Sequence, residues 1–385
     1  MFIILLLAFG ISAYFLYSQK RPLKQLLLLP VAPLYFAVLN LRHHMEQTAL
    51  MSAGLTILTL IFLFSPNLFL QLILFALYFG WSSVLIYFGG VPNTGARSAI
   101  PYKKAFPPIV LNTPKKGLEL LVFQTGKIET GSWGVYEGPS KPIVMDEAAF
   151  VIKHPTHGYI MYETGIHPEV SSDPVGYVGP LLYFGGFLKM EQEKHQDILS
   201  QLKKNRITLN DIKTIFVSHL HPEHGGAITS FPDTPIAVDK KEYDYAFNKP
   251  KYNYFEKEYK TVEKWKLLDF EQKNDFEPFE GAIDWFKDGS VFVISTPGHT
   301  PGHISLLLNL PQGPVFLVGD IIWKQENLST QTIGMPFVSV DGEAHRKALG
   351  QLTKFVEVNP EVLIVPSHDL RNVKNTSRGD IKIVN

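Results

Sequence analysis

Three histidines and a glutamate stand close together after an apolar run of the sequence. Residues Thr214–Val217 are followed by His219, His221, Glu223 and His224. Side chains alternate between two faces of an extended backbone, so His219 and His221 point to the same side. The chain has no cysteine, which leaves imidazoles and carboxylates as ligands for zinc, iron, manganese or cobalt. A single histidine is more often structural, but three within six residues predict a metal site.

Three later segments also place a candidate ligand directly after an apolar run. These candidates are His299, Asp320 and His368. Loops at strand ends carry catalytic groups on a rigid scaffold and can assemble one site from segments that are far apart in sequence. We therefore expect all of these side chains to contribute to a single site.

The order of these motifs resembles the signature of the metallo-β-lactamase superfamily. That signature is His-x-His-x-Asp-His, then a Gly-His, then an Asp and a final His, and four separated motifs follow this order between about residues 118 and 370. Within the superfamily, Val217–Phe247 and Thr296–His303 look most like the N-acyl homoserine lactonases, and the glyoxalase II thioesterases come next.

The resemblance implies a four-layer αβ/βα sandwich, with the metals at one edge of the paired sheets. It also implies that His219, His221 and His299 hold a first metal, that Glu223, His224 and His368 hold a second, and that Asp320 bridges both. His303 matches no ligand of the family, and we expect it to support the site from behind.

The implied reaction is metal-assisted hydrolysis of an ester or lactone. One or two Zn²⁺ ions, or Fe, Mn or Co in their place, would present a bound hydroxide to the carbonyl. Glu223 and Asp320 would then pass the proton to the leaving group. The expected partner is therefore a small ester, lactone or thioester. A formal net charge of zero gives no long-range attraction for nucleic acid, so we expect no nucleic-acid partner.

Three residues depart from the pattern of the family. Glu223 replaces the usual aspartate, and its extra methylene moves the carboxylate by ~1.5 Å. Glu163 stands where the family commonly has Asp-Thr-Gly, and Trp323 stands where lactonases carry a tyrosine that contacts the substrate carbonyl. An indole offers only an N–H donor and no hydroxyl. The departures therefore bear on the expected lactonase activity and leave the expected fold unchanged.

The amino-terminal quarter has a different composition from the rest of the chain. Its four apolar stretches, at residues 2–19, 25–41, 47–64 and 67–89, each approach the ~20 residues that cross a bilayer. Residues 1–90 contain only five charged side chains. No charged segment precedes the first stretch and three more follow, so a cleaved signal peptide is the weaker interpretation. We expect about four transmembrane helices, hence a multi-pass membrane protein with the lipid bilayer as a partner.

The side of the membrane that the catalytic domain faces is less strongly determined. Lys20, Arg21 and Lys24 favour a cytoplasmic first loop. Arg97, Lys103 and Lys104 favour a cytoplasmic segment after the last helix. With four spans these two segments lie on opposite sides. The uncharged amino terminus favours an extracytoplasmic catalytic domain, and a count of three spans would reverse that orientation.

The remainder of the sequence is expected to be a linker at 91–117 and one α/β domain at 118–385. Apolar runs predict strands at Leu118–Phe123, Ala148–Lys153, Tyr159–Tyr162, Thr214–Val217, Ile236–Val238, Val291–Ser295, Ile304–Leu308, Val315–Val318 and Val362–Val365. Helical periodicity predicts helices at Met190–Lys204 and Glu343–Val358. Strands alternating with helices favour mixed sheets with the helices outside them.

Two alternatives to a lactonase or esterase remain open. A thioesterase of the glyoxalase II type needs basic groups to hold an anionic thiol carrier, and Arg371, Lys374, Arg378 and Lys382 are candidates. A charged tail is, however, usually only solvated. The second alternative is a membrane-bound metal-binding protein without turnover, in which the glutamate replacements reflect lost catalysis.

Overall fold

The structure is a computed structural model that describes residues 97–384, apart from 138–140, 180–188, 249–252, 271–273 and 335–337, together with residues 73, 74, 76–78 and 80. The four stretches predicted to span a membrane lie almost wholly outside these residues. Within the described part of the chain, no helix is both long enough and apolar enough to cross a bilayer. One compact unit comprises Ser98–Thr130, Pro142–Ile333 and Ser339–Asn385, and it contains every candidate ligand.

The first of two sheets runs in the order β14-β1-β2-β3-β5-β6-β7, with β4 paired to β1. Its strands are β1 (Glu119–Gly131), β2 (Pro142–His154), β3 (Gly158–Tyr162), β4 (Lys189–Glu191), β5 (Ile212–Phe216), β6 (Ile236–Asp239), β7 (Trp265–Leu268) and β14 (Ile381–Val384). Strands β3, β5, β6 and β7 are parallel to one another. Their carboxyl ends therefore lie along one edge, where β5 leads into the histidine-rich loop.

The second sheet runs in the order β13-β12-β11-β10-β9-β8. Its strands are β8 (Asn274–Phe276), β9 (Phe279–Asp284), β10 (Val291–Ser295), β11 (Ile304–Leu310), β12 (Gly313–Gly319) and β13 (Leu363–Pro366). Strand β11 is antiparallel to both β10 and β12, and β13 is parallel to β12. Strands β10, β12 and β13 therefore end at the same edge, directly before His299, Asp320 and His368.

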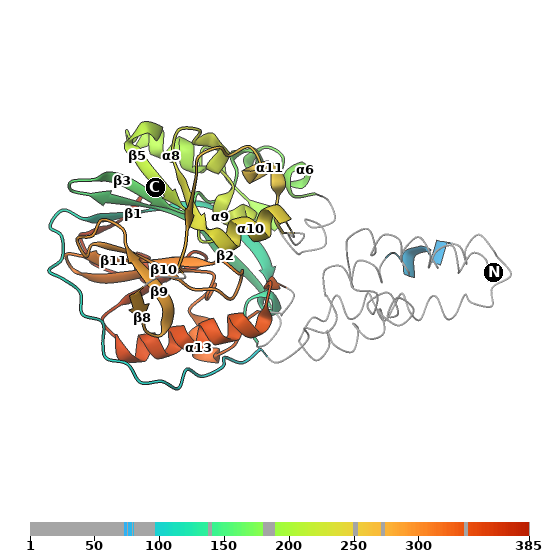
Figure 1. Ribbon diagram of the computed structural model, residues 1–385. Coiled ribbons are helices and arrows are strands. Elements are labelled where there is room, and N and C mark those ends of the chain that lie inside the picture. Colours follow the sequence, from blue (N-terminus) through green and yellow to red (C-terminus); the bar gives the residue numbers. More distant parts are fainter. Residues whose placement is uncertain are drawn as a thin grey trace. The chain divides into compact units, whose positions relative to one another are not determined.

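Helices cover the outer face of each sheet and give a four-layer arrangement (Figure 1). Those on the first sheet are α8 (Ile198–Lys204), α9 (Pro222–Gly225), α10 (Lys240–Asn248) and α11 (Glu256–Tyr259), and α13 (Gly342–Val358) covers the second. Shorter elements are η1 (Ser132–Gly134), η2 (Pro168–Ser171), α6 (Pro174–Val178), η3 (Leu209–Asp211), η4 (Ile228–Ser230), α12 (Glu326–Thr330) and α14 (Arg371–Lys374). The described chain thus has the mixed α/β sandwich that the sequence predicts.

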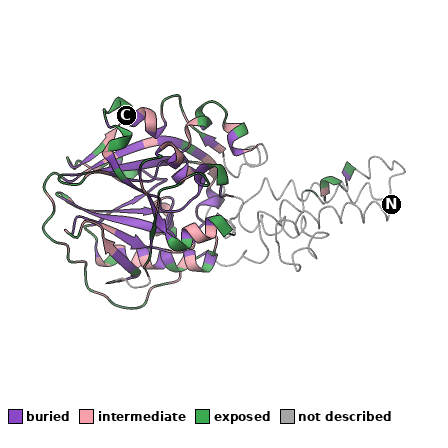
Figure 2. Ribbon diagram, turned by 45° about the horizontal axis from the view of Figure 1, so that its top comes forward, coloured by how far each residue is buried: buried purple, intermediate pink, exposed green. Residues whose placement is uncertain are grey.

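Strand β2 shows why the layers stack in this way. Phe150 and Ile152 pack into the core between the two sheets, whereas Ala149 and Val151 pack into the core beneath the helices of the first sheet. A strand that is buried on both faces has apolar residues at successive positions rather than in alternation. Figure 2 shows this continuous buried interior running through both sheets.

The predicted helix at Met190–Lys204 is only half right. Met190 belongs to β4 and pairs with Ile128 of β1. The helix begins at α8, after Asp197, whose carboxylate accepts a hydrogen bond from the amide of Ser200 at 2.9 Å. Such a capping carboxylate satisfies an amide that has no partner within the helix, and it marks the true helix start.

The described part of the predicted linker, residues 91–117, packs against the domain. The amide of Ile100 donates to a carbonyl of α13, and Gly350 on that helix leaves room for the passing chain, since a Cβ there would lie 1.8 Å from the oxygen of Ile100. Further along, the amide of Ile109 donates to Asn359 Oδ1 at 2.7 Å. This segment is therefore bound along the second sheet's helical face and contributes to the folded unit.

Candidate metal centre

The loop after β5 and the short helix α9 carry four of the candidate ligands. His219 and His221 flank Leu220, and both are buried. The backbone of His221 is still extended, with φ −79° and ψ 154°, and Pro222 then begins the helix. Proline suits this first helical position because its φ is already fixed near the helical value. The turn brings Glu223 and His224 beside the two preceding histidines.

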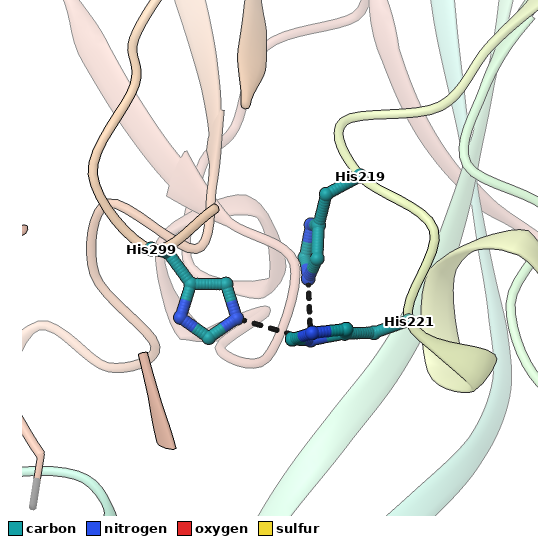
Figure 3. A group of neighbouring side chains, drawn as sticks. All are labelled: His219, His221 and His299. Atoms are coloured by element: carbon teal, nitrogen blue, oxygen red, sulfur yellow. Dashed lines mark hydrogen bonds between the residues drawn. The ribbon is translucent and has the colours of Figure 1, made fainter. Parts of the chain in front are cut away.

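His219, His221 and His299 form a first group, in which one ring nitrogen of each lies within 4.8 Å of the others. Nδ1 of His221 lies 2.9 Å from Nε2 of His219 and 3.1 Å from Nε2 of His299. Figure 3 shows the three rings converging from two loops. The structure therefore brings the three histidines of the first predicted set together.

Glu223, His224, Asp320 and His368 form a second group with the same limit of 4.8 Å. The Nε2 atoms of His224 and His368 lie 3.4 and 3.1 Å from Oδ1 of Asp320. Three of the four residues are buried, and Glu223 is partly exposed. The second predicted set is therefore also assembled in space.

Asp320 lies between the two groups and turns one oxygen toward each. Its Oδ1 faces His224 and His368, whereas its Oδ2 lies 3.5 Å from Nε2 of His299 and 3.9 Å from Nε2 of His219. A carboxylate in this position is able to serve two cations at once. All seven candidate ligands therefore form one continuous site at the joined edges of the two sheets.

Several polar atoms of the site have no hydrogen-bond partner within the described structure. They are both ring nitrogens of His224, Nδ1 of His299, Oδ1 of Asp320 and Oε2 of Glu223. Buried polar atoms without partners are costly and rare in folded proteins, so each one calls for an explanation. Neutral imidazoles and carboxylates facing one another suit divalent cations of the zinc type. The residues therefore fit the metals that the sequence resemblance implies.

The two groups differ in their electrostatics. Burial, reinforced by the neighbouring imidazoles, lowers the pKa of His219 and His299 well below the usual value. Burial also acts on His224 and His368, but carboxylates beside them outweigh it and raise the pKa of each well above the usual value. Those same two histidines hold the pKa of Asp320 well below its usual range despite its burial.

Residues 144–368 match the family model of the metallo-beta-lactamase superfamily, and this range includes all seven candidate ligands. The chain belongs to this superfamily. It is 30% identical over 228 residues to the N-acyl homoserine lactonase AttM of Rhizobium radiobacter, which covers 57% of this chain and 80% of the relative. It is also 31% identical over 222 residues to an N-acyl homoserine lactonase of a Bacillus species, covering 55% and 77% of the two chains.

Solved structures agree on the fold of this superfamily member. An N-acyl homoserine lactone hydrolase, with the product N-hexanoyl-L-homoserine bound at its catalytic metal centre, superposes with a TM-score of 0.55. That comparison covers 70% of this chain and 98% of the other, at 23% identity. With this fold and these relatives, the chain is a metal-dependent hydrolase.

Two buried carboxylates lie behind the second group of ligands. Glu163 Oε1 lies 3.3 Å from Nδ1 of His224, and Glu147 Oε1 lies 2.9 Å from Nδ1 of His368. Carboxylates in this position orient a ligating imidazole and raise its basicity. Sequence reasoning identified Glu163 only as a departure from the family and missed Glu147 altogether. The available signal for Glu147 was an acidic residue in a strand that is otherwise buried.

His303 has the supporting position expected of it. Its Nδ1 lies 2.8 Å from the hydroxyl of Thr296, and its Nε2 accepts a hydrogen bond from the amide of Asp320 at 2.9 Å. Both ring nitrogens therefore have partners. His303 fixes the backbone from which the carboxylate of Asp320 projects.

A third cluster, comprising His154, His157 and Asp288, lies at the β2–β3 and β9–β10 turns. Nδ1 of His154 accepts from the amides of Thr156 and His157 at 3.2 Å, so the ring proton of the neutral form is on Nε2. Nε2 faces Asp288, which also pairs with Lys115 at 2.8 Å. A metal on Nε2 would have to displace that proton and compete with the ammonium. We therefore interpret this cluster as a support for the turns.

Proposed function

We propose that this superfamily member is a zinc-dependent lactonase that opens N-acyl homoserine lactones or lactones of similar chemistry. The observation that carries the proposal is the position of Asp320 between two groups of ligands, in a chain about 30% identical to N-acyl homoserine lactonases over most of their length. Neither of the Glu-for-Asp replacements removes a carboxylate from the site. The same chemistry extends to simple esters.

The proposed ligand roles follow the two groups. His219, His221 and His299 would hold the first metal, Glu223, His224 and His368 the second, and Asp320 both. When bound, such metals lower the pKa of a water molecule toward neutrality and polarise a carbonyl oxygen. Zinc suits this mixture of imidazoles and carboxylates, and iron, manganese and cobalt are the alternatives.

The carboxylates of the site would handle the proton that the leaving alkoxide requires. Burial raises the pKa of Glu223, and its Oε2 has no partner among the described residues, so this oxygen is available to carry a proton. The neighbouring Asp320 stays ionised, because its pKa is held low. Two carboxylates whose pKa values move in opposite directions suit acid and base roles in one site.

Trp323 stands at a position where the lactonases that this chain resembles have a tyrosine. Its Nε1–H donates a hydrogen bond to Oδ2 of Asp320. The indole is buried and lies against the ring of His299, with centroids 5.4 Å apart. The only donor of this side chain therefore orients Asp320, and no hydroxyl from this position reaches a substrate carbonyl. We expect this change to alter the range of lactones accepted rather than the class of reaction.

The structure weakens the case for a glyoxalase-type thioesterase. The four basic residues considered for an anionic carrier are all in ion pairs: Arg371 with Asp369 and Glu326, Lys374 with Asp146, Arg378 with Asp380, and Lys382 with Glu119. A cation whose charge is already balanced attracts an anionic carrier less strongly. The lactone or ester is therefore the preferred substrate class.

We also propose that the amino-terminal 90 residues anchor this hydrolase in a membrane through about four helices. The support is the sequence alone, in its four apolar stretches and five charged residues. Reporter fusions placed after Gly90 would determine which side the domain faces, and we expect the extracytoplasmic side. A soluble full-length chain without detergent would contradict the anchor.

The proposed activity is tested by assaying the purified full chain, loaded with Zn²⁺, against N-acyl homoserine lactones of several acyl lengths, aryl esters and thioesters. We expect lactones to be the best substrates. The matched control is the chain with His219→Ala and His221→Ala, which should lose hydrolysis. Bound zinc without hydrolysis of any substrate would favour the metal-binding protein without turnover.

A further inference from the structure

One buried carboxylate of the molecule belongs to neither group of ligands, yet it lies directly beneath the first. Glu242 is in the first turn of α10, and its side chain is fully buried. A carboxylate in such a place is costly unless hydrogen bonds compensate for the lost water. The groups that contact Glu242 therefore indicate which segments its carboxylate stabilises.

The first of these contacts is with the loop of two ligands. Oε1 of Glu242 accepts a hydrogen bond from the amide of Leu220 at 2.9 Å. Leu220 is the residue between His219 and His221, so fixing its amide fixes the backbone from which both imidazoles project. The carboxylate thereby acts on both histidines without contacting either ring.

The second contact is with the segment that covers His221. The hydroxyl of Tyr254 donates to the same oxygen of Glu242 at 2.8 Å. The ring of Tyr254 packs edge-on against the ring of His221, with centroids 4.9 Å apart and planes at 80°. Glu242 therefore also sets one wall of the space available to that imidazole.

The third contact is with the loop of the remaining ligand. Thr300 and Gly302 follow His299, and both lie close enough to the carboxyl of Glu242 to oppose the rise of its pKa on burial, although neither makes a hydrogen bond of normal geometry to Oε2. A Cβ on Gly302 would lie 2.2 Å from the amide nitrogen of Glu242. The backbones of these two segments are therefore in direct contact, with no space for a side chain between them.

We propose that Glu242 is the positioning residue of the first metal group: its carboxylate ties the loop of His219 and His221 to α10, and its backbone packs directly against the loop that follows His299. It touches no substrate and no ligand ring, and it acts through Leu220. The inference rests on the proposed metal binding, but it does not depend on which bond the enzyme hydrolyses. The second group has its own supports in Glu147 and Glu163, so Glu242 should affect it little.

The test measures Zn²⁺ affinity in full chains that retain one group at a time. Glu242→Ala is combined with His368→Ala, which leaves the first group, and separately with His219→Ala and His221→Ala, which leave the second. Competition with a zinc-chelating dye gives each affinity. We expect a loss of about tenfold to a hundredfold in the first background, the range seen when supports of ligands are removed, and a change of less than about twofold in the second.

Two further variants keep the result interpretable. Glu242→Gln retains an oxygen that accepts from the Leu220 amide and the Tyr254 hydroxyl, so the first group should recover most of its Zn²⁺ affinity. If Glu242→Ala does not fold, the Zn²⁺ affinity of Glu242→Gln tests the positioning role in its place. Asp239→Asn is the matched control. Asp239 is a buried carboxylate just before the same helix, and among the described residues its side chain accepts a hydrogen bond from the amide of Lys241 rather than from a ligand loop.

The outcomes separate this inference from the proposed function. Equal zinc loss in both backgrounds, or none in either, would overturn the positioning role. A lowered melting temperature of the zinc-free chain with unchanged zinc affinity would do the same, since it reveals a support of the fold alone. A wild-type chain that binds zinc but hydrolyses no lactone would remove the lactonase proposal and leave this inference standing.

Discussion

The two ligand groups of this site are built on different principles. The first consists of three imidazoles, of which His219 and His299 have pKa values well below the usual one, and Glu242 of α10 holds the backbone amide between His219 and His221. The second mixes imidazoles with carboxylates, and carboxylates behind His224 and His368 raise the pKa of both. At the first group a metal therefore meets imidazoles of lowered proton affinity, whereas at the second group it must compete with protons for His224 and His368. The comparison teaches that Asp320 lies between two groups of candidate ligands whose histidines differ in proton affinity.

The strongest test of this comparison removes the first group. A chain with His219→Ala and His221→Ala should lose the first metal and more than ~100-fold in kcat/KM, beyond what losing a supporting residue costs. The second group should keep its metal, because all four of its candidate ligands are retained, although the ring of His224 loses its contact with the ring of His219, whose centroid lies 4.2 Å away. Elemental analysis and kinetics check this. Retention of two metals would show that the ligand assignment is wrong.

The zinc affinities of the two groups should depend differently on pH. Binding at the second group releases protons from His224 and His368, so its zinc affinity should rise with pH and fall as the solution becomes acidic, by up to about tenfold per pH unit for each proton released. His219 and His299 are already neutral, and the first group should respond little over the same range. Chelator competition from about pH 6 to about pH 8 in the single-group chains measures both slopes. Equal slopes would contradict the contrast.

Removing a support of the second group should be milder than removing a ligand. Glu147→Gln keeps the shape of the side chain but takes its charge away from Nδ1 of His368. We expect the second metal to bind about tenfold to a hundredfold more weakly and the first to be unaffected. Zinc titration of the His219→Ala, His221→Ala chain with and without Glu147→Gln gives the value. An unchanged second affinity would mean that Glu147 only fills the core.

The smallest expected effect comes from shortening Glu223. Glu223→Asp restores the shorter arm usual in the family and should tighten the second metal by up to about tenfold, or ~1.4 kcal/mol. Metal stoichiometry and kcat/KM of the two forms are compared. A fall in both would show that the surrounding site is adapted to glutamate, so that the longer side chain supports metal binding and hydrolysis.

The structure also changes where the domain should be considered to begin. Sequence reasoning ended the linker at residue 117, because residues 91–117 are rich in proline and have little periodicity. Ile100 and Ile109 nevertheless hydrogen-bond to the domain. Irregular backbone can pack well when the receiving surface supplies hydrogen-bond partners and room, as Arg346 and Asn359 supply acceptors and Gly350 supplies room here. Composition alone does not contain that information.

The sequence by itself determined the chemistry of this protein. Residue type and a spacing of two in an extended segment made His219 and His221 neighbours, and apolar runs placed His299, Asp320 and His368 at strand ends. Such features are local, because the period of a strand and the composition of a buried run are set by residues near in sequence.

Only the tertiary structure decided how these residues are supported and coupled. The register of β2 against its neighbours brings Glu147 behind His368, 221 positions away, and the packing of α10 beneath two loops places Glu242 under Leu220. The two oxygens of Asp320 could be assigned to two groups only once both sheets were in place. Contacts between distant segments depend on strand order and layer packing, which no local pattern specifies. This is the physical reason that the candidate ligands and His303 could be predicted from the sequence, whereas Glu147 and Glu242 could not.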